Sequence, residues 1–181
     1  MDIRFIQSQH HRIATVVTRK DGVRLSVPVY GPLDPIPHDL AHYVLELELG
    51  LEDGFWGSVA AGALFEGIHI LAGRQGPHAT DRSRAVLAAH RQGIGISEVL
   101  VGWIMDVVKG TSLGNEPLPI ASPLVRTRAD QAALLARLRP AIEAMCTRWG
   151  AVPPGGTLLV VWPDRPARLE RASHRRAARQ H

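Results

Sequence analysis

Residues 23–29 (VRLSVPV) alternate apolar with polar side chains, a period-two pattern that predicts a strand with one buried face. Residues 12–19 (RIATVVTR) also have strand composition, and an Asp-Gly turn signal separates the two runs. Residues 2–8 (DIRFIQS) fit a further strand. We therefore expect a three-stranded antiparallel meander over residues 2–30. Pro28 has no N–H to donate, so its strand is expected to lie at an edge.

The pattern changes after the proline-rich break at residues 31–37 (GPLDPIP), where helical periodicity begins. A late apolar run, GGTLLVVWP at residues 155–163, predicts one more strand. The expected fold is therefore α+β, a small antiparallel sheet packed against about five helices. The expected helices lie near residues 38–49, 54–73, 81–93, 97–110 and 127–150.

The charge of the chain is concentrated at its C-terminal end. The net charge is +4, and residues 164–181 contain six arginines but two acidic side chains, so residues 1–163 balance to zero. Hydrophobic residues make up 45% of the whole chain, and its length of 181 residues fits one globular domain, which we place at residues 1–163. We expect residues 164–181 to form a flexible basic tail, the part of the chain suited to an acidic partner or nucleic acid.

The cysteine content and the apolar runs of the sequence bear on the cellular compartment of the protein. Cys146 is the single cysteine, so an internal disulfide framework is excluded. The N-terminus lacks the apolar core of a signal peptide, and no run approaches the roughly 18 apolar residues of a membrane span. A cytoplasmic protein that does not cross a membrane is the expectation.

One short stretch suggests chemistry. His38 and His42 are four residues apart in a predicted helix, so both imidazoles project from one face and can reach a single ion. The spacing is that of the His-Glu-x-x-His helices of zinc peptidases, although Asp39 stands where those helices have glutamate. Asp39 could still act as a general base on a metal-bound water. Glu46 continues the same stripe one turn later.

Two sets of metal ligands are open. His38 and His42 could bind the ion together with Glu66 and His69, which would share a face of the helix expected over residues 54–73. Otherwise His42 and Glu46 could bind the ion without His38, because His38 and Glu46 are two helical turns apart and one ion cannot contact both. Zinc, iron, nickel and manganese are all compatible with these ligand types.

The same residues also have a simpler interpretation. Pro37 fits the start of a helix, where Asp39 would interact favourably with the helix dipole and His38 could act as a capping residue. His42 could then be an interior histidine bonded to a backbone carbonyl. The sequence alone leaves the metal site and this structural interpretation both open.

Residues 37–62 (PHDLAHYVLELELGLEDGFWGSVAAG) resemble a block found in small uncharacterised bacterial proteins. The block joins the histidine helix to a Gly-Phe-Trp-Gly turn and covers about a seventh of the chain. The resemblance implies a bacterial source, and it carries no activity, cofactor or fold.

Two functional hypotheses follow. The first is a metal-dependent hydrolase, in which a divalent ion such as zinc lowers the pKa of a bound water and Asp39 or Glu46 accepts its proton. The second is a non-catalytic binding module that contacts an acidic partner or nucleic acid through its arginine-rich tail.

Overall fold

The computed structural model describes residues 1–8, 13–29, 35–116, 118 and 125–164. Its sheet has five strands in the order β4-β3-β2-β1-β5, with every neighbouring pair antiparallel. The strands are β1 (Asp2–Gln7), β2 (Ile13–Thr18), β3 (Arg24–Val27), β4 (His69–Ala72) and β5 (Thr157–Val161). The expected meander and late strand are confirmed, and the late strand pairs with β1.

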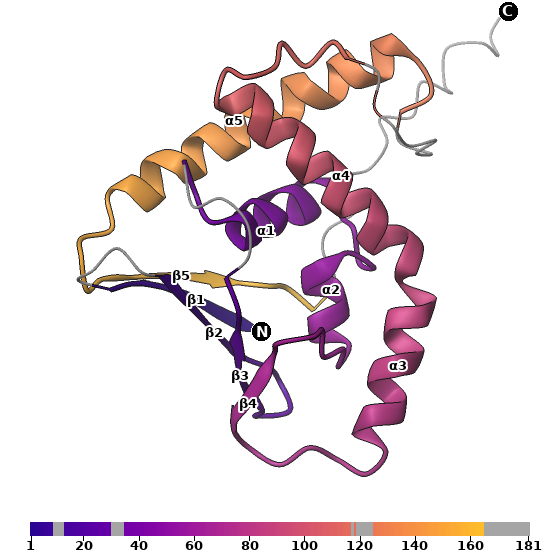
Figure 1. Cartoon of the computed structure of the whole chain (residues 1–181), viewed down its shortest axis with the longest axis vertical. Helices are drawn as coiled ribbons and strands as arrows, with labels where there is room; N and C mark the ends of the chain where they lie inside the picture. The colour runs from indigo at the N-terminus through magenta and orange to yellow at the C-terminus, as the bar shows by residue number, and fades with distance from the viewer. Residues whose placement is uncertain (9–12, 30–34, 117, 119–124, 165–181) are drawn as a thin grey trace, which may run out of the picture.

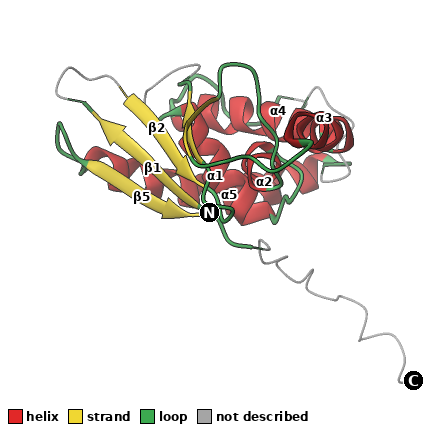
Figure 2. Cartoon of the chain, turned by 90° about the horizontal axis from the view of Figure 1, so that it is seen from below, coloured by secondary structure: helices red, strands yellow, loops and turns green. Residues whose placement is uncertain are grey.

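The described residues form five helices, most of which lie on one side of the sheet (Figure 1). They are α1 (His38–Leu49), α2 (Phe55–Ala60), α3 (Ala79–Ala89), α4 (Arg91–Val108) and α5 (Arg128–Gly150). Helix α1 contacts α2, α4 and α5, and in both views α3 lies beside the sheet rather than over it (Figure 2). The predicted α+β class is therefore confirmed.

The core lies between the sheet and the helices. Ile3 and Phe5 alternate with outward-facing residues along β1, and both are fully buried, as the period of a strand requires. The ring of Trp56 meets Phe5 edge to face, with centroids 6.2 Å apart. Leu40 and Leu45 of α1 belong to the same buried core and are 0% exposed. Helix α1 is therefore held firmly against the sheet.

Helix α1 begins and ends where the sequence predicts. Pro37 precedes the first helical residue, and its carbonyl accepts from the amides of Leu40 and Ala41. Gly50 ends the helix in the left-handed conformation, with φ 63° and ψ 38°, as a C-terminal glycine does. The position of both histidines on this helix is thus set by local sequence signals.

The helix expected over residues 54–73 is wrong beyond its first turns. Helix α2 ends at Ala60, and the following chain passes through Gly62, whose φ of 108° is incompatible with a right-handed helix. The chain then forms β4, which pairs with β3. Strand β3 is consequently interior, so the edge position predicted from Pro28 is also wrong; that residue follows the last residue of β3.

The helix expected over residues 81–93 is divided differently from the prediction. Helix α3 starts at Ala79, two residues before the predicted start at residue 81, and His90 separates it from α4. Gly93 therefore lies in the first turn of α4 and does not end a helix. The carboxylate of Asp53 occupies the space beside Gly93 that a Cβ atom would need.

Among the described residues, no helix combines the length and apolar character required to cross a lipid bilayer. Of the predicted basic tail, Asp164 belongs to the described part of the chain, where it forms an ion pair with Lys20. Residues 165–181 lie outside the described residues, and so do the predictions made for them.

Candidate metal centre

The side chains of His38 and His42 meet on one face of α1, as their spacing predicts. Their Nε2 atoms lie 3.1 Å apart, and the two rings are nearly perpendicular, at 76°. His42 is 1% exposed, and the side chain of His38 is 22% exposed. One imidazole is thus anchored in the core while the other lies at the surface.

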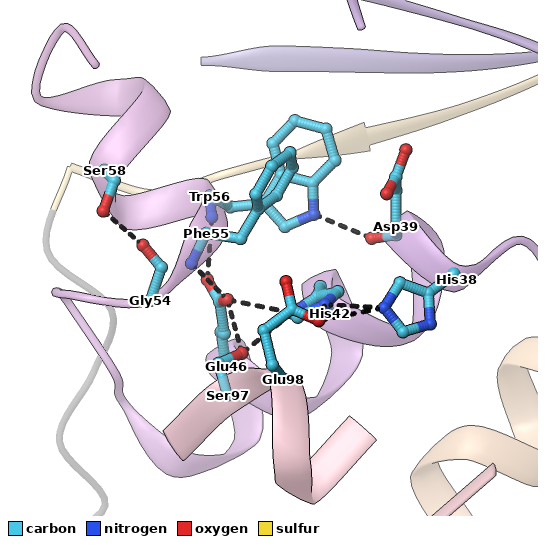
Figure 3. Close-up of polar contacts among 10 residues, drawn as sticks. All are labelled: His38, Asp39, His42, Glu46, Gly54, Phe55, Trp56, Ser58, Ser97 and Glu98. Carbon is cyan, nitrogen blue, oxygen red and sulfur yellow. Dashed lines mark hydrogen bonds and ion pairs between the residues drawn. The ribbon is translucent and has the colours of Figure 1, made fainter. Parts of the chain in front are cut away.

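Glu98 of α4 supplies a third polar group at the same point (Figure 3). Its Oε2 atom lies 3.3 Å from Nε2 of His38 and 3.4 Å from Nε2 of His42. Two nitrogens and one oxygen therefore form a nearly equilateral triangle. We call His38, His42 and Glu98 the triad; among the described residues they form a group whose potential metal-ligating atoms all lie within 4.8 Å of one another.

The sequence interpretation did not find Glu98 as a ligand. The helix expected over residues 97–110 consists mostly of apolar residues, so a carboxylate within it was a usable signal. Nothing in the spacing along the chain joins Glu98 to residues on a helix 60 positions earlier. The contact between α1 and α4 creates the triad.

The other ring nitrogen of His42 faces the interior. Its Nδ1 atom lies 2.8 Å from Oγ of Ser97, which in turn lies 2.7 Å from Oε1 of Glu46. All three side chains are at least 99% buried. The ring of His42 therefore lies between two groups of polar side chains: His38 and Glu98 near Nε2, and Ser97 and Glu46 near Nδ1.

Glu46 has a structural role that its place in the sequence did not predict. Its Oε1 accepts from the amide of Phe55 at 2.6 Å, and its Oε2 accepts from the amide of Trp56 at 2.9 Å. These are free N–H groups at the start of α2, so Glu46 caps that helix from α1. Glu46 is fully buried and each of its oxygens accepts an amide N–H, so its position does not support the predicted roles of metal ligand and general base.

Asp39 does not reach the triad. Its carboxylate is directed away from His38, His42 and Glu98 (Figure 3), and the residue is 4% exposed. Oδ2 has no hydrogen-bond partner among the described residues. Burial raises the pKa of Asp39 to about 6, against the opposing effect of the two histidines. The predicted role of Asp39 as a base on a metal-bound water is therefore not supported by its orientation.

The charges around His42 favour a cation. Burial by itself would lower the pKa of His42, but the contacts with Glu46 and Glu98 outweigh it and raise that pKa to about 9. The contacts with His38 and His42 hold the pKa of Glu98 well below its usual range. The same negative potential that retains a proton on His42 would attract a metal ion.

Glu66 and His69 are not brought to this site. Glu66 lies in the segment after α2 and His69 begins β4, so the two do not share a helix face. Both are exposed. The structure therefore does not bring together the four ligands predicted from sequence, and the residue from outside α1 that lies beside His38 and His42 is Glu98 of α4.

A cavity of about 620 Å³ lies elsewhere in the molecule. Its walls include Glu52, Asp53, His90 and Trp162, and none of the triad residues lines it. The cavity lacks a set of converging ligand atoms comparable to the triad among the described residues. We therefore treat the triad as the candidate functional site.

Comparison with known proteins adds no relative: no protein-family model, curated protein or solved structure matches this chain. The resemblance of residues 37–62 to a small bacterial family accordingly stays a prediction.

Proposed function

We propose that this protein binds a divalent metal ion through His38, His42 and Glu98 and uses the ion to activate water for hydrolysis. The observation that carries the proposal is the triangle of ligand atoms, with edges of 3.1, 3.3 and 3.4 Å.

The size of this triangle matches a metal site. Ligands bound to zinc at about 2.0–2.1 Å in a tetrahedron are separated from one another by about 3.3 Å. The three edges of the triad are close to this value, so an ion could sit slightly above its plane without a rearrangement of the backbone. Three imidazole or carboxylate ligands with a remaining open position are typical of catalytic zinc, whereas structural sites usually have four protein ligands.

The open position of the site would face solvent. The side chain of Glu98 is 50% exposed and that of His38 is 22% exposed, while His42 anchors the site from within. A bound ion would therefore keep access to water and to a carbonyl or phosphoryl oxygen. The ion would lower the pKa of the water and polarise that oxygen.

The decisive experiment measures metal content and affinity in tag-free protein after reconstitution with zinc, iron(II) or manganese. We expect near-stoichiometric binding by the wild type, with Glu98→Ala and His38→Ala each weakening it by at least about tenfold. Both residues are partly exposed, so the chain should still fold. The controls are Glu66→Ala and His69→Ala, which should bind as the wild type does.

The outcomes separate the ligand sets. Loss of binding in Glu66→Ala or His69→Ala, with Glu98→Ala unaffected, would restore the four-ligand set predicted from sequence. Absence of binding by the wild type for all three metals would refute the proposal. Hydrolysis is tested next with activated carboxylic and phosphoric esters: activity should require the added metal and should disappear in Glu98→Ala.

A further inference from the structure

On its buried side, His42 begins a chain of side-chain hydrogen bonds that is separate from the backbone hydrogen bonds of the helices and strands. It runs from Nδ1 of His42 to the Ser97 hydroxyl at 2.8 Å, and from that hydroxyl to Glu46 at 2.7 Å. Nδ1 of His42 also lies 3.4 Å from Oε1 of Glu46. Glu46 is held in turn by the amides of Phe55 and Trp56.

The direction of each hydrogen bond in this chain can be assigned by following the donors. Glu46 accepts amide N–H groups at both oxygens, and the Ser97 hydroxyl donates its one hydrogen to Oε1. The Ser97 oxygen therefore has only lone pairs left for His42. A hydrogen bond at 2.8 Å then requires that Nδ1 of His42 carries a proton and donates it to Ser97.

A neutral imidazole has one N–H, so protonation of Nδ1 leaves a lone pair on Nε2. Nε2 is the atom that faces His38 at 3.1 Å and Glu98 at 3.4 Å. The competing tautomer would place the proton on Nε2, where the contact with Glu98 is longer than the contact of Nδ1 with Ser97. The buried polar chain thus favours the tautomer that a metal ion requires.

We infer that Ser97 and Glu46 are positioning residues of the metal site, which orient His42 and hold its proton on Nδ1 so that Nε2 is presented to the ion. This inference rests on the proposed function. Metal-binding histidines commonly donate their second N–H to a carboxylate or another acceptor, and loss of such a partner typically weakens metal affinity about 10–100-fold. Here a serine relays the contact to the carboxylate.

The first test compares zinc affinity, measured by competition with a chelator, in the wild type and in Ser97→Ala. We expect affinity to fall about 10–100-fold in Ser97→Ala. Ser97→Thr retains a hydroxyl and should recover most of the wild-type affinity. Wild-type affinity in Ser97→Ala, or a loss in Ser97→Thr as large as that in Ser97→Ala, would overturn the inference.

Ser58 provides a matched control. It is also fully buried, and its hydroxyl lies 3.0 Å from Nδ1 of a histidine, His90, that is outside the triad. Ser58→Ala should lose stability on removal of its hydrogen bonds but should bind zinc as the wild type does. An equal loss of affinity in Ser58→Ala and Ser97→Ala would show a general effect on the fold and would overturn the inference.

A second measurement needs no metal and so separates this inference from the proposed function. The ¹⁵N shifts of the His42 ring, observed through its carbon-bound protons in metal-free protein above pH 9, identify the protonated nitrogen. We expect the proton on Nδ1 in the wild type and a larger share on Nε2 in Ser97→Ala. A proton on Nε2 in the wild type would overturn the assignment, whereas absence of zinc binding with the proton on Nδ1 would refute the proposed function alone.

Discussion

The carboxylate of Glu46 occupies the space that a side chain at residue 54 would need. A Cβ atom built on Gly54 would lie 2.7 Å from Oε2 of Glu46, and the other carboxylate atoms would be closer still. This relationship explains why a glutamate on α1 and the Gly-Phe-Trp segment eight residues later form one structural unit: the glycine admits the carboxylate, and the next two amides bind it.

Gly54→Ala should therefore destabilise the fold. The added methyl group would displace a buried carboxylate from its two amide donors, and overpacking of this kind costs about 1–3 kcal/mol. Urea denaturation measures the free energy of unfolding. The control is Gly95→Ala in α4, where a Cβ atom would meet nothing within 4 Å and where alanine should stabilise the helix by about 0.5–1 kcal/mol. Equal effects of the two substitutions would contradict this packing argument.

Zinc affinity should rise with pH. The pKa of His42 is raised to about 9 by Glu46 and Glu98, so at neutral pH the metal-free site holds a proton that the ion must displace. Between pH 6 and pH 8 we expect the apparent affinity to increase about tenfold for each unit. Competition titrations at several pH values, corrected for the chelator, measure this slope. A pH-independent affinity would exclude His42 as a ligand that loses a proton on binding.

Asp39→Asn should stabilise the protein at alkaline pH. The pKa of Asp39 is raised to about 6 by burial, so the folded state favours the protonated carboxyl, and stability is lost as pH rises from the ordinary value of 3.8 through 6. At pH 8 the substitution should raise the free energy of unfolding by about 1–3 kcal/mol. The gain should shrink toward zero near pH 4.

The control for this substitution is Asp21→Asn. Despite some burial, the contacts of Asp21 with Arg19 and with the amide of Val23 lower its pKa, so its charged form stabilises the fold. Asp21→Asn should accordingly fail to stabilise the protein at pH 8. Stabilisation by both substitutions would indicate a general effect of net charge and not the burial of one carboxylate.

Removal of residues 165–181 should separate metal binding from electrostatic association. A chain that ends at Asp164 keeps the ion pair between this residue and Lys20 and loses the six arginines of residues 165–181. We expect zinc affinity to be unchanged and any salt-sensitive binding to heparin or nucleic acid to disappear. If the shortened chain still binds heparin or nucleic acid, the basic binding surface lies within residues 1–164 and not in the tail.

Metal should also raise the thermal stability of the folded chain, because the triad joins α1 to α4. A ligand that binds the folded state alone at 100 times its dissociation constant adds about 2.7 kcal/mol to the free energy of unfolding. Thermal denaturation with and without zinc tests this expectation. Glu98→Ala should show a much smaller shift, and an equal shift in this variant would place the ion elsewhere.

Local sequence signals determined much of the fold and two of the three residues of the candidate site. Alternation over residues 23–29, together with strand composition and a turn signal before it, predicted the meander, and the helix expected over residues 38–49 is α1. The spacing of His38 and His42 placed both imidazoles on one helix face, where their Nε2 atoms meet. Each of these features depends on residues within a few positions of one another, so the sequence is sufficient to predict it.

Tertiary contacts decided the rest. Glu98 reaches the histidines because α4 packs on α1, and Glu46 is withdrawn from the site because α2 offers it two free amides. His69 lies in a strand, β4, and not in the predicted helix, because β4 pairs with β3. In each case the partner of the residue is distant along the chain. The packing of the helices and the sheet determines which partner is within reach, and no local sequence pattern does.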